Sequence, residues 1–433
     1  MKDLTQRTFS ILFLLLILIG LSFVFYLYVP DHWQYENSWA RVASKIMLYY
    51  LLFIFARTLF LLSLSFIEYL FKKRIKPVET FPLVSIIVPC YNEEVGLAKA
   101  IDSLRRIDYP NLEILIVDDG SKDDTFKIAK KLEQNYEVRL IHQENAGKSQ
   151  ALNNGIQQAL GEYFVCMDAD SVLSENLLID SLPYFEADKN LAAVAGAVQV
   201  GNANSLLTKF QKLEYIVGLN FHKMAQSCLN LVTIVPGPIG VFKKEAVLKV
   251  GGYHTDTYAE DCDLSMRLLM ARYNIKYTGK IKARTEAPDN FGQLITQRYR
   301  WSRGMIQAIL KSTNELTKKF TFRRAFVVSY MFMETVIIPL INFTFVLITL
   351  QFALTYSTTE LMGPFFIGLT ILDMTLILYS IIAEKELGSL LFLGILNRLT
   401  YGLSLEVIRF FSIIDEIFRL PMKWGNLVRK GMN

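Results

Sequence analysis

The chain has 433 residues, of which 52% are hydrophobic and 20% charged, and its 46 basic and 41 acidic residues give a formal net charge of +5. A hydrophobic fraction this high favours a membrane protein over a soluble one. The basic residues gather beside apolar segments, which suits membrane lipids with anionic headgroups as partners. Nothing in the charge pattern supports a nucleic-acid partner.

Two apolar segments lie near the N-terminus, at residues 11–29 and 46–71. A helix needs about 20 apolar residues to cross a bilayer, and no small-residue cleavage site follows the first segment. The second segment ends in Lys72, Lys73 and Arg74, which marks the cytoplasmic side by the positive-inside rule. We therefore predict two transmembrane helices in residues 1–74 and a cytosolic domain after them.

Further apolar segments follow that domain, at residues 326–354, 362–382 and 387–418. The first two predict transmembrane helices. The third is interrupted by several polar residues, and a single crossing there would place the basic tail outside, against the charge rule. We predict an interfacial or re-entrant element at residues 387–418. The whole chain is then a multi-pass protein of the inner (plasma) membrane, with membrane and interfacial helices and a basic tail in residues 325–433.

Residues 75–324 have a different pattern, in which short apolar strands alternate with amphipathic helices. The expected strands are residues 84–90, 113–118, 138–142 and 163–167, and the expected helices are residues 94–106, 123–134 and 148–160. This alternation predicts an α/β domain with a largely parallel sheet, whose ligands bind beyond the carboxyl ends of the strands. The sequence has neither a P-loop nor a strand followed by G-x-G-x-x-G, so metal ions and basic side chains would have to hold any bound phosphates.

Polar side chains follow three of these strands. Tyr91, Asn92 and Glu93 follow the first, Asp119 the second, and Asp168 and Asp170 the fourth, as the sequence places them. Carboxylates at the end of an apolar strand suit Mg²⁺ or Mn²⁺, which prefer oxygen ligands. The alternatives are ordinary turn chemistry for Asp119 and a solvated acidic loop for the Asp-x-Asp pair.

Glu260 and Asp261 precede an apolar run that predicts a helix starting near Asp261. The helix dipole and the free amides would hold an aspartate there in its ionised form. An ionised carboxylate can remove a proton from an attacking hydroxyl group as a general base. The alternative role for Asp261 is that of a helix N-cap.

A basic and aromatic run, Gln297 to Trp301, lies within an expected helix over residues 290–311. Arginine side chains match phosphate oxygens, and a tryptophan ring offers a flat face to a sugar. An interfacial amphipathic helix with basic and aromatic anchors would have the same composition.

In this order, the motifs resemble those of the processive membrane-bound family 2 glycosyltransferases, which include poly-N-acetylglucosamine, hyaluronan, chitin and cellulose synthases. The resemblance covers about residues 84–303. It implies a cytosolic GT-A domain, α/β and Rossmann-like, inserted between N- and C-terminal transmembrane helices. Ala259 stands where the family usually has threonine before its Glu-Asp pair, a difference that leaves both carboxylates in place.

The same resemblance implies roles for single residues. Asp261 would be the catalytic base, with Glu260 beside it, and Asp168 and Asp170 would bind Mg²⁺ or Mn²⁺. The remaining residues divide into donor-binding Tyr91, Asn92, Glu93, Asp119, Lys148, Asp168 and Arg300, and acceptor-binding Gln297, Arg298, Trp301 and Gly237.

The implied activity is metal-dependent, inverting polymerisation of a sugar from a UDP-sugar, with UDP-N-acetylglucosamine as the favoured donor. The product would be a β-linked exopolysaccharide that the enzyme also moves across the membrane. The growing polysaccharide is then the acceptor, and accessory membrane subunits are open as further partners. Two alternatives remain at this point: transfer of a single sugar to a lipid-linked acceptor, and a non-catalytic membrane subunit or transporter.

Overall fold

The computed structural model describes residues 38–71, 76, 80–355, 359–386, 389–398 and 400–422. The first expected membrane helix, at residues 11–29, lies outside these residues. The strands are β1 (Val84–Cys90), β2 (Leu112–Asp118), β3 (Val138–His142), β4 (Tyr163–Cys166), β5 (Val172–Leu173), β6 (Leu191–Val200), β7 (Gly240–Lys243) and β8 (Asn274–Thr285).

The helices of the domain around this sheet are α3 (Leu97–Leu104), α4 (Thr125–Asn135), α5 (Lys148–Gln158), α6 (Leu177–Ala187), α7 (Leu206–Glu214), the π-helix η2 (Tyr215–Asn220), α8 (Phe221–Cys228), α9 (Lys244–Lys249), α10 (Glu260–Met270) and α11 (Phe291–Lys318). The flanking helices are α2 (Ser38–Phe71), α12 (Phe322–Phe332), the π-helix η3 (Met333–Ile337), α13 (Ile338–Thr355), α14 (Thr359–Glu384), α15 (Leu390–Asn397) and α16 (Tyr401–Ile417).

The sheet has the strand order β3-β2-β1-β4-β7-β6-β8-β5. The four expected strands pair in parallel at one side, in the order β3, β2, β1 and β4. The other half is mixed, because β7 pairs antiparallel with both β4 and β6 while β6 pairs parallel with β8. The prediction of a largely parallel sheet is therefore right for the first half of the domain and wrong for the second.

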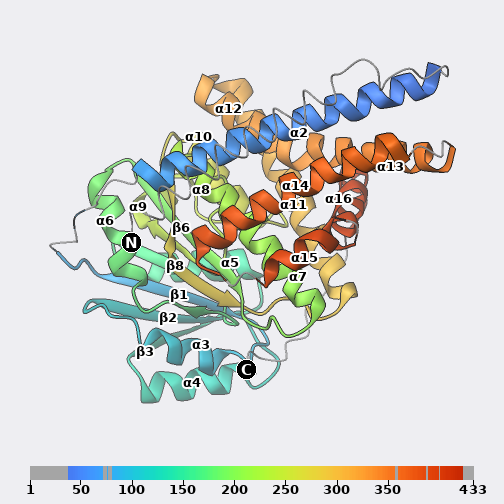
Figure 1. Cartoon of the computed structure of the whole chain (residues 1–433). Coiled ribbons are helices and arrows are strands. Elements are labelled where there is room, and N and C mark those ends of the chain that lie inside the picture. Colours follow the sequence, from blue (N-terminus) through green and yellow to red (C-terminus); the bar gives the residue numbers. More distant parts are fainter. Residues whose placement is uncertain are drawn as a thin grey trace.

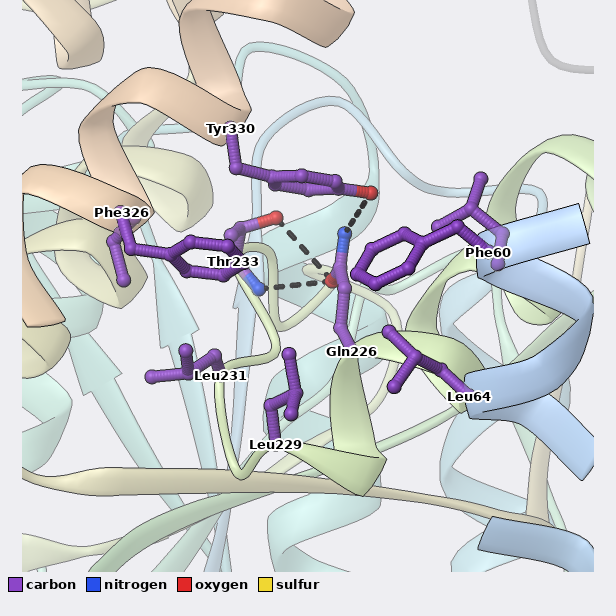
Figure 2. Close-up of a pocket in the computed structure, with 10 residues that line it drawn as sticks. Phe60, Leu64, Gln226, Leu229, Leu231, Thr233, Phe326 and Tyr330 are labelled. Carbon is purple, nitrogen blue, oxygen red and sulfur yellow. Dashed lines mark hydrogen bonds between the residues drawn. The ribbon is translucent and has the colours of Figure 1, made fainter. Parts of the chain in front are cut away.

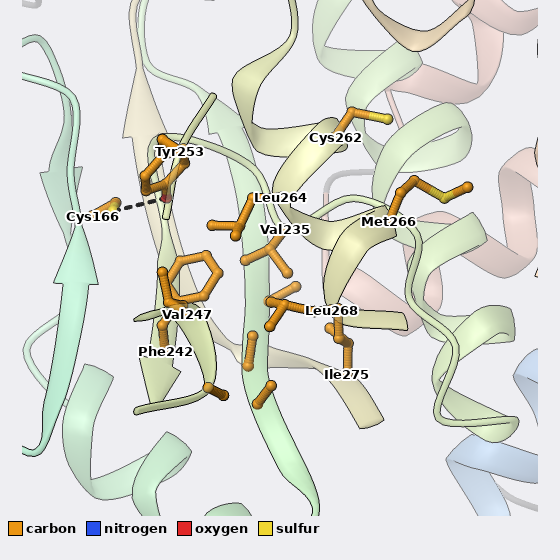
Figure 3. Close-up of a cluster of buried hydrophobic side chains, with 14 of the residues drawn as sticks. Cys166, Val235, Phe242, Val247, Tyr253, Cys262, Leu264, Met266, Leu268 and Ile275 are labelled. Carbon is orange, nitrogen blue, oxygen red and sulfur yellow. Dashed lines mark hydrogen bonds between the residues drawn. The ribbon is translucent and has the colours of Figure 1, made fainter. Parts of the chain in front are cut away.

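Both faces of the sheet are covered, so its central strands are buried on both sides, as β1 and β6 show by their almost continuous burial. A strand covered in this way needs an unbroken apolar run instead of alternation. One core cluster lies between the sheet and α10, where Phe242 of β7 and Leu264 of α10 belong to the same packed group (Figure 3). In this cluster the Cys166 thiol and the Tyr253 hydroxyl are 3.1 Å apart.

Among the described residues, three helices are long and apolar enough to cross a membrane, over Arg41–Leu70, Phe322–Thr355 and Phe366–Glu384. They coincide with three of the expected spans. In Figure 1, α2 and α13 run beside each other and extend past the sheet. Tyr50 of α2 and Phe345 of α13 join them by a stacked ring contact with centroids 3.9 Å apart.

The last apolar segment forms α15 and α16, which meet at a bend of 52°. Such a bend occurs in a broken span or a re-entrant loop, so the predicted interfacial or re-entrant path stays a prediction. Helix α16 packs along α11 of the domain around the sheet, where Ser412 donates a hydrogen bond to Ser302 at 2.6 Å. The C-terminal helices are thereby attached to the domain that carries the sequence motifs.

A close crossing of α10 and α11 predicts that Gly304→Ala destabilises the protein. A Cβ atom at Gly304 would lie 2.5 Å from the backbone nitrogen of Ala259, so one of the two segments would have to move. Overpacking of this kind costs about 1–3 kcal/mol of unfolding free energy, which thermal denaturation in detergent would detect. Gly292→Ala is the control on the same helix, because its nearest atom would be at 3.5 Å. Equal melting temperatures for the two variants would contradict the prediction.

Candidate active site

Three sequence motifs meet at the ammonium group of Lys148. Lys148 begins α5, Asp168 follows β4, and Glu260 begins α10. The Lys148 Nζ atom lies 2.6 Å from Asp168 Oδ1 and 3.1 Å from Glu260 Oε1. The Asp168 and Glu260 side chains are 25% and 12% exposed and the Lys148 side chain is 40% exposed, so water screens these charges in part. The predicted metal motif and the predicted base motif are therefore joined through one lysine.

Glu260 and Asp261 have opposite pKa shifts. Burial alone would raise the pKa of Glu260, but the charges of Lys148 and Arg300 outweigh it and the pKa lies below its ordinary value. Burial raises the pKa of Asp261 to about 6, the Glu260 charge adds to this rise, and Lys148 opposes it. Two neighbouring carboxyl groups with separated pKa values are typical of acid-base sites.

The helix N-terminus contributes less to Asp261 than the sequence predicts. The backbone N–H of Cys262 does donate to Asp261 Oδ1 at 2.8 Å, which favours the ionised form. Burial and the Glu260 charge nevertheless leave the pKa of Asp261 above its ordinary value. Asp261 is thus mostly ionised at neutral pH and takes up a proton near pH 6, which is the range in which a general base works well.

Asp168 and Asp170 have the donor chemistry of a divalent-cation site. Asp170 is 8% exposed, and its Oδ1 atom accepts hydrogen bonds from Ser171 Oγ at 3.1 Å and from Thr285 Oγ1 at 3.3 Å. Within the described residues, no group of three or more His, Cys, Asp or Glu side chains is arranged to hold a metal ion. Two carboxylates suit Mg²⁺ or Mn²⁺ when diphosphate oxygens and water complete the coordination.

The polar residues after β1 and β2 fasten their two loops together. Asn92, which has a positive φ of 55°, accepts a hydrogen bond from the Lys122 backbone N–H at 2.8 Å through its side chain. The Glu93 backbone N–H donates to Thr125 Oγ1 at 2.7 Å, and Tyr91 beside it is half-buried. These contacts hold the predicted donor-binding strand end against the start of α4.

Asp119, which is predicted to bind the donor, has a side chain whose oxygens are occupied by hydrogen bonds within the protein. Its side chain is buried, and its oxygens accept hydrogen bonds from the Ala146 and Gly147 backbone N–H groups at 2.9 and 2.8 Å and from Gln143 Nε2 at 2.7 Å. Asp119 therefore shapes the loop that leads into Lys148. The direct contact of Asp119 with the donor stays a prediction.

The run from Gln297 to Trp301 lies in α11, as expected, but its side chains differ in their surroundings. Arg300 is half-buried and donates to the Tyr258 carbonyl oxygen at 3.1 Å, just before Glu260. Arg298 is only 6% exposed and forms an ion pair with Glu214 at 2.7 Å. Arg298 is therefore a buried residue beneath the predicted acceptor side, and its direct contact with the acceptor stays a prediction.

Gly237 lies where the loop after α8 passes the Lys148 cluster. A Cβ atom at Gly237 would be 3.0 Å from Lys148 Nζ and 3.5 Å from Asp168 Oδ2, so the backbone closely approaches these side chains. Figure 2 shows the start of the same loop beside an apolar pocket between α2 and α12. There, Gln226 accepts hydrogen bonds from the Thr233 backbone and side chain and donates one to the Tyr330 hydroxyl group.

Glu214 is the site residue that the sequence analysis does not identify. It is the last residue of α7 and lies outside every motif, in an amphipathic helix with polar and basic neighbours that give it no local signal. Burial alone would raise the pKa of Glu214, but Arg298 and its hydrogen bonds keep that pKa below its ordinary value. The partner lies on a helix distant in sequence, so spacing could not reveal this pair.

Family models match most of the described domain. Residues 85–251 match the model described as Glycosyl transferase family 2, and residues 257–427 match the model described as Chitin synthase. The boundary between the two matches falls just before Glu260, so the residues from Tyr91 to Asp170 belong to the first match, and Glu260, Asp261 and the run from Gln297 to Trp301 belong to the second.

Several curated relatives are named poly-beta-1,6-N-acetyl-D-glucosamine synthase. One from Staphylococcus epidermidis is 34% identical over 229 residues, which cover 53% of this chain and 56% of the relative. Another, from Staphylococcus aureus (strain COL), is 32% identical over 240 residues, which cover 55% of this chain and 58% of the relative. The matched region thus spans a little over half the length of these relatives.

A solved structure has the same fold at low sequence identity. It is a mannosyltransferase from Pyrobaculum calidifontis in complex with GDP-Man and Mn²⁺, with a TM-score of 0.58 and 17% identity, covering 89% of this chain and 98% of that chain. Together with the first family match, this likeness confirms the predicted fold class.

Proposed function

We propose that the chain, whose residues 85–251 match the Glycosyl transferase family 2 model, is a glycosyltransferase that polymerises N-acetylglucosamine from UDP-N-acetylglucosamine into a β-linked polysaccharide. The names of the staphylococcal relatives support the sugar and the polymeric product. The match of residues 257–427 to the chitin synthase model supports polymerisation by the half that holds the base and acceptor motifs.

The observation that carries the proposal is the bridge from Lys148 to Asp168 and Glu260, at 2.6 and 3.1 Å. It brings the donor-side carboxylates beside the pair that contains Asp261. A donor diphosphate and an acceptor hydroxyl group must meet at such a junction, because bond making and bond breaking occur at one carbon atom.

In the proposed reaction, Asp261 takes the proton of the acceptor hydroxyl group as its oxygen attacks the anomeric carbon. The new bond from this carbon to the acceptor oxygen forms as its bond to the donor diphosphate breaks, with inversion of configuration. UDP leaves with the bonding electron pair. Lys148 and Arg300 supply positive charge for the departing diphosphate, which is electrostatic stabilisation of the transition state.

Mg²⁺ or Mn²⁺ would be held by Asp168 and Asp170, whose carboxylates provide suitable oxygen ligands. When bound, the ion supplies further positive charge against the diphosphate oxygens. The mannosyltransferase of the same fold was solved with Mn²⁺, which supports a divalent ion in this type of site.

The membrane arrangement belongs to the same proposal. Helices long enough to span a bilayer occur before β1 and after α11, which supports a domain inserted between membrane segments. We place this domain in the cytosol at the inner (plasma) membrane, where nucleotide-sugars are available. The membrane helices would then conduct the growing chain outward.

Product analysis tests the proposed function. The full chain in detergent or lipid nanodiscs is incubated with radiolabelled UDP-N-acetylglucosamine, and in parallel with other UDP- and GDP-sugars, with and without a chelator. The expected result is a high-mass polymer from UDP-N-acetylglucosamine alone that β-N-acetylhexosaminidase degrades, with activity lost on chelation and restored by Mg²⁺ or Mn²⁺.

Other products of this assay would overturn the proposal in distinct ways. A lipid-soluble monoglycoside would indicate single transfer to a lipid-linked acceptor. Polymer from another donor would change the sugar but leave polymerisation intact. Absence of both product and donor hydrolysis would indicate a non-catalytic membrane subunit.

A further inference from the structure

A buried ionic network joins three helices beneath the predicted acceptor side. Arg298 of α11 donates to Glu214 of α7 through two atoms, Nε to Oε1 at 2.9 Å and Nη2 to Oε2 at 2.7 Å. Tyr401, the first residue of α16, donates its hydroxyl hydrogen to the same Glu214 carboxylate. The Arg298 and Glu214 side chains are 6% and 11% exposed.

Such a network is poorly explained by stability alone. Desolvation of two charges offsets most of their attraction, and well-packed apolar residues often stabilise a protein as much as a buried ion pair does. Removal of one partner, in contrast, leaves an uncompensated buried charge. A pair of this kind is best suited to fixing a neighbouring group in one orientation.

The neighbours of Arg298 are the two motif residues predicted to bind the acceptor. Its Nη1 atom donates to the side-chain oxygen of Gln297, and its guanidinium carbon lies 4.3 Å from the Trp301 ring centroid. The Tyr215 ring, which follows Glu214 directly, lies 5.6 Å from the same guanidinium carbon. The planar, charged group of Arg298 therefore supports Trp301 from one side, a contact that a lysine would not reproduce.

We propose that Glu214 and Tyr401 are positioning residues that, through Arg298, hold Trp301 and Gln297 in the orientation needed to bind the growing chain. Tyr401 belongs to the C-terminal α16, so the helices after the cytosolic domain form part of the acceptor side. This inference rests on the proposed function, because the role of Trp301 as an acceptor platform belongs to it.

The chain offers a matched control on the same pair of helices. Arg303 of α11 forms an ion pair with Glu416 of α16 at 2.6 Å, and these side chains are 3% and 11% exposed. The guanidinium group of Arg303 lies near the Tyr258 and Tyr299 rings instead of Trp301. Glu416→Gln thus weakens an equally buried ion pair between α11 and α16 without removing the support of Trp301.

The experiment compares Glu214→Gln, Tyr401→Phe and Glu416→Gln in the full chain. We expect Glu214→Gln to raise the KM for an acceptor oligosaccharide of β-linked N-acetylglucosamine about tenfold, the effect of losing about one positioned contact, and to shorten the polymer. The donor KM should stay within about twofold of the wild-type value, because the donor side is not in this network. Tyr401→Phe, which removes a single hydroxyl group, should act in the same direction with a smaller effect.

A second readout does not depend on activity. It is acrylamide quenching of Trp301 fluorescence, measured as the difference between each protein and its Trp301→Phe counterpart. This quenching should increase in Glu214→Gln and not in Glu416→Gln. Wild-type quenching and polymer length in Glu214→Gln, or equal changes in Glu416→Gln, would overturn the positioning role. If the wild type makes no polymer, the proposed function fails, while the quenching difference still tests the support of Trp301.

Discussion

Asp261→Asn is expected to lower sugar transfer by about 10²- to 10⁴-fold, the usual contribution of a positioned general base. Asparagine keeps the size of the side chain and its hydrogen bond to the Cys262 amide, but it cannot accept the proton of the acceptor hydroxyl group. Binding of the UDP-sugar should be unchanged, because the predicted donor contacts remain. Initial rates of polymer formation and calorimetric titration with UDP would separate the two effects.

Asp256→Asn is a suitable control for this substitution. Asp256 precedes the same helix but is 69% exposed and pairs with Lys311, and exposed ion pairs contribute little to stability. We expect wild-type transfer rates from this control. A rate for Asp261→Asn close to that of Asp256→Asn would remove Asp261 from its role as the base.

Lys148→Met is expected to reduce the rate about a hundredfold or more, since it removes the positive charge that faces Asp168 and Glu260 from the place where negative charge develops on the diphosphate. It should also move the pH dependence. Transfer requires ionised Asp261, whose pKa lies at about 6, so the wild-type rate should rise with pH through about 6 and then level off. Lys148 lowers the pKa values of Asp261 and Glu260, so its loss should shift this rise to higher pH.

Lys148→Arg provides the comparison for the charge. It retains a positive group facing Asp168 and Glu260, so the rise in rate should remain near its wild-type pH even if the longer side chain lowers the maximum rate. Arg300, the other positive charge acting on Asp261 and Glu260, is unchanged in both variants. A pH profile that is the same in Lys148→Met and the wild type would show that Lys148 does not tune the base.

Local pattern accounts for much of the parallel half of the sheet. The expected strands at residues 84–90 and 138–142 coincide with β1 and β3, and those at 113–118 and 163–167 differ from β2 and β4 by one residue. A strand buried on both faces requires a continuous apolar run, which is visible in the residues themselves. The mixed half was not predicted, because the antiparallel insertion of β7 between β4 and β6 depends on pairing between segments distant in sequence.

The sequence by itself determined the type of protein, the order of its motifs and the candidate residues, because apolar periodicity and motif spacing are local properties of the chain. Only the tertiary structure decided which of these residues meet. Lys148 touches both Asp168 and Glu260, and Arg298 turns inward to Glu214. The tertiary structure also decided the pKa of Asp261, because that pKa depends on burial and on charged side chains that belong to other helices and strands.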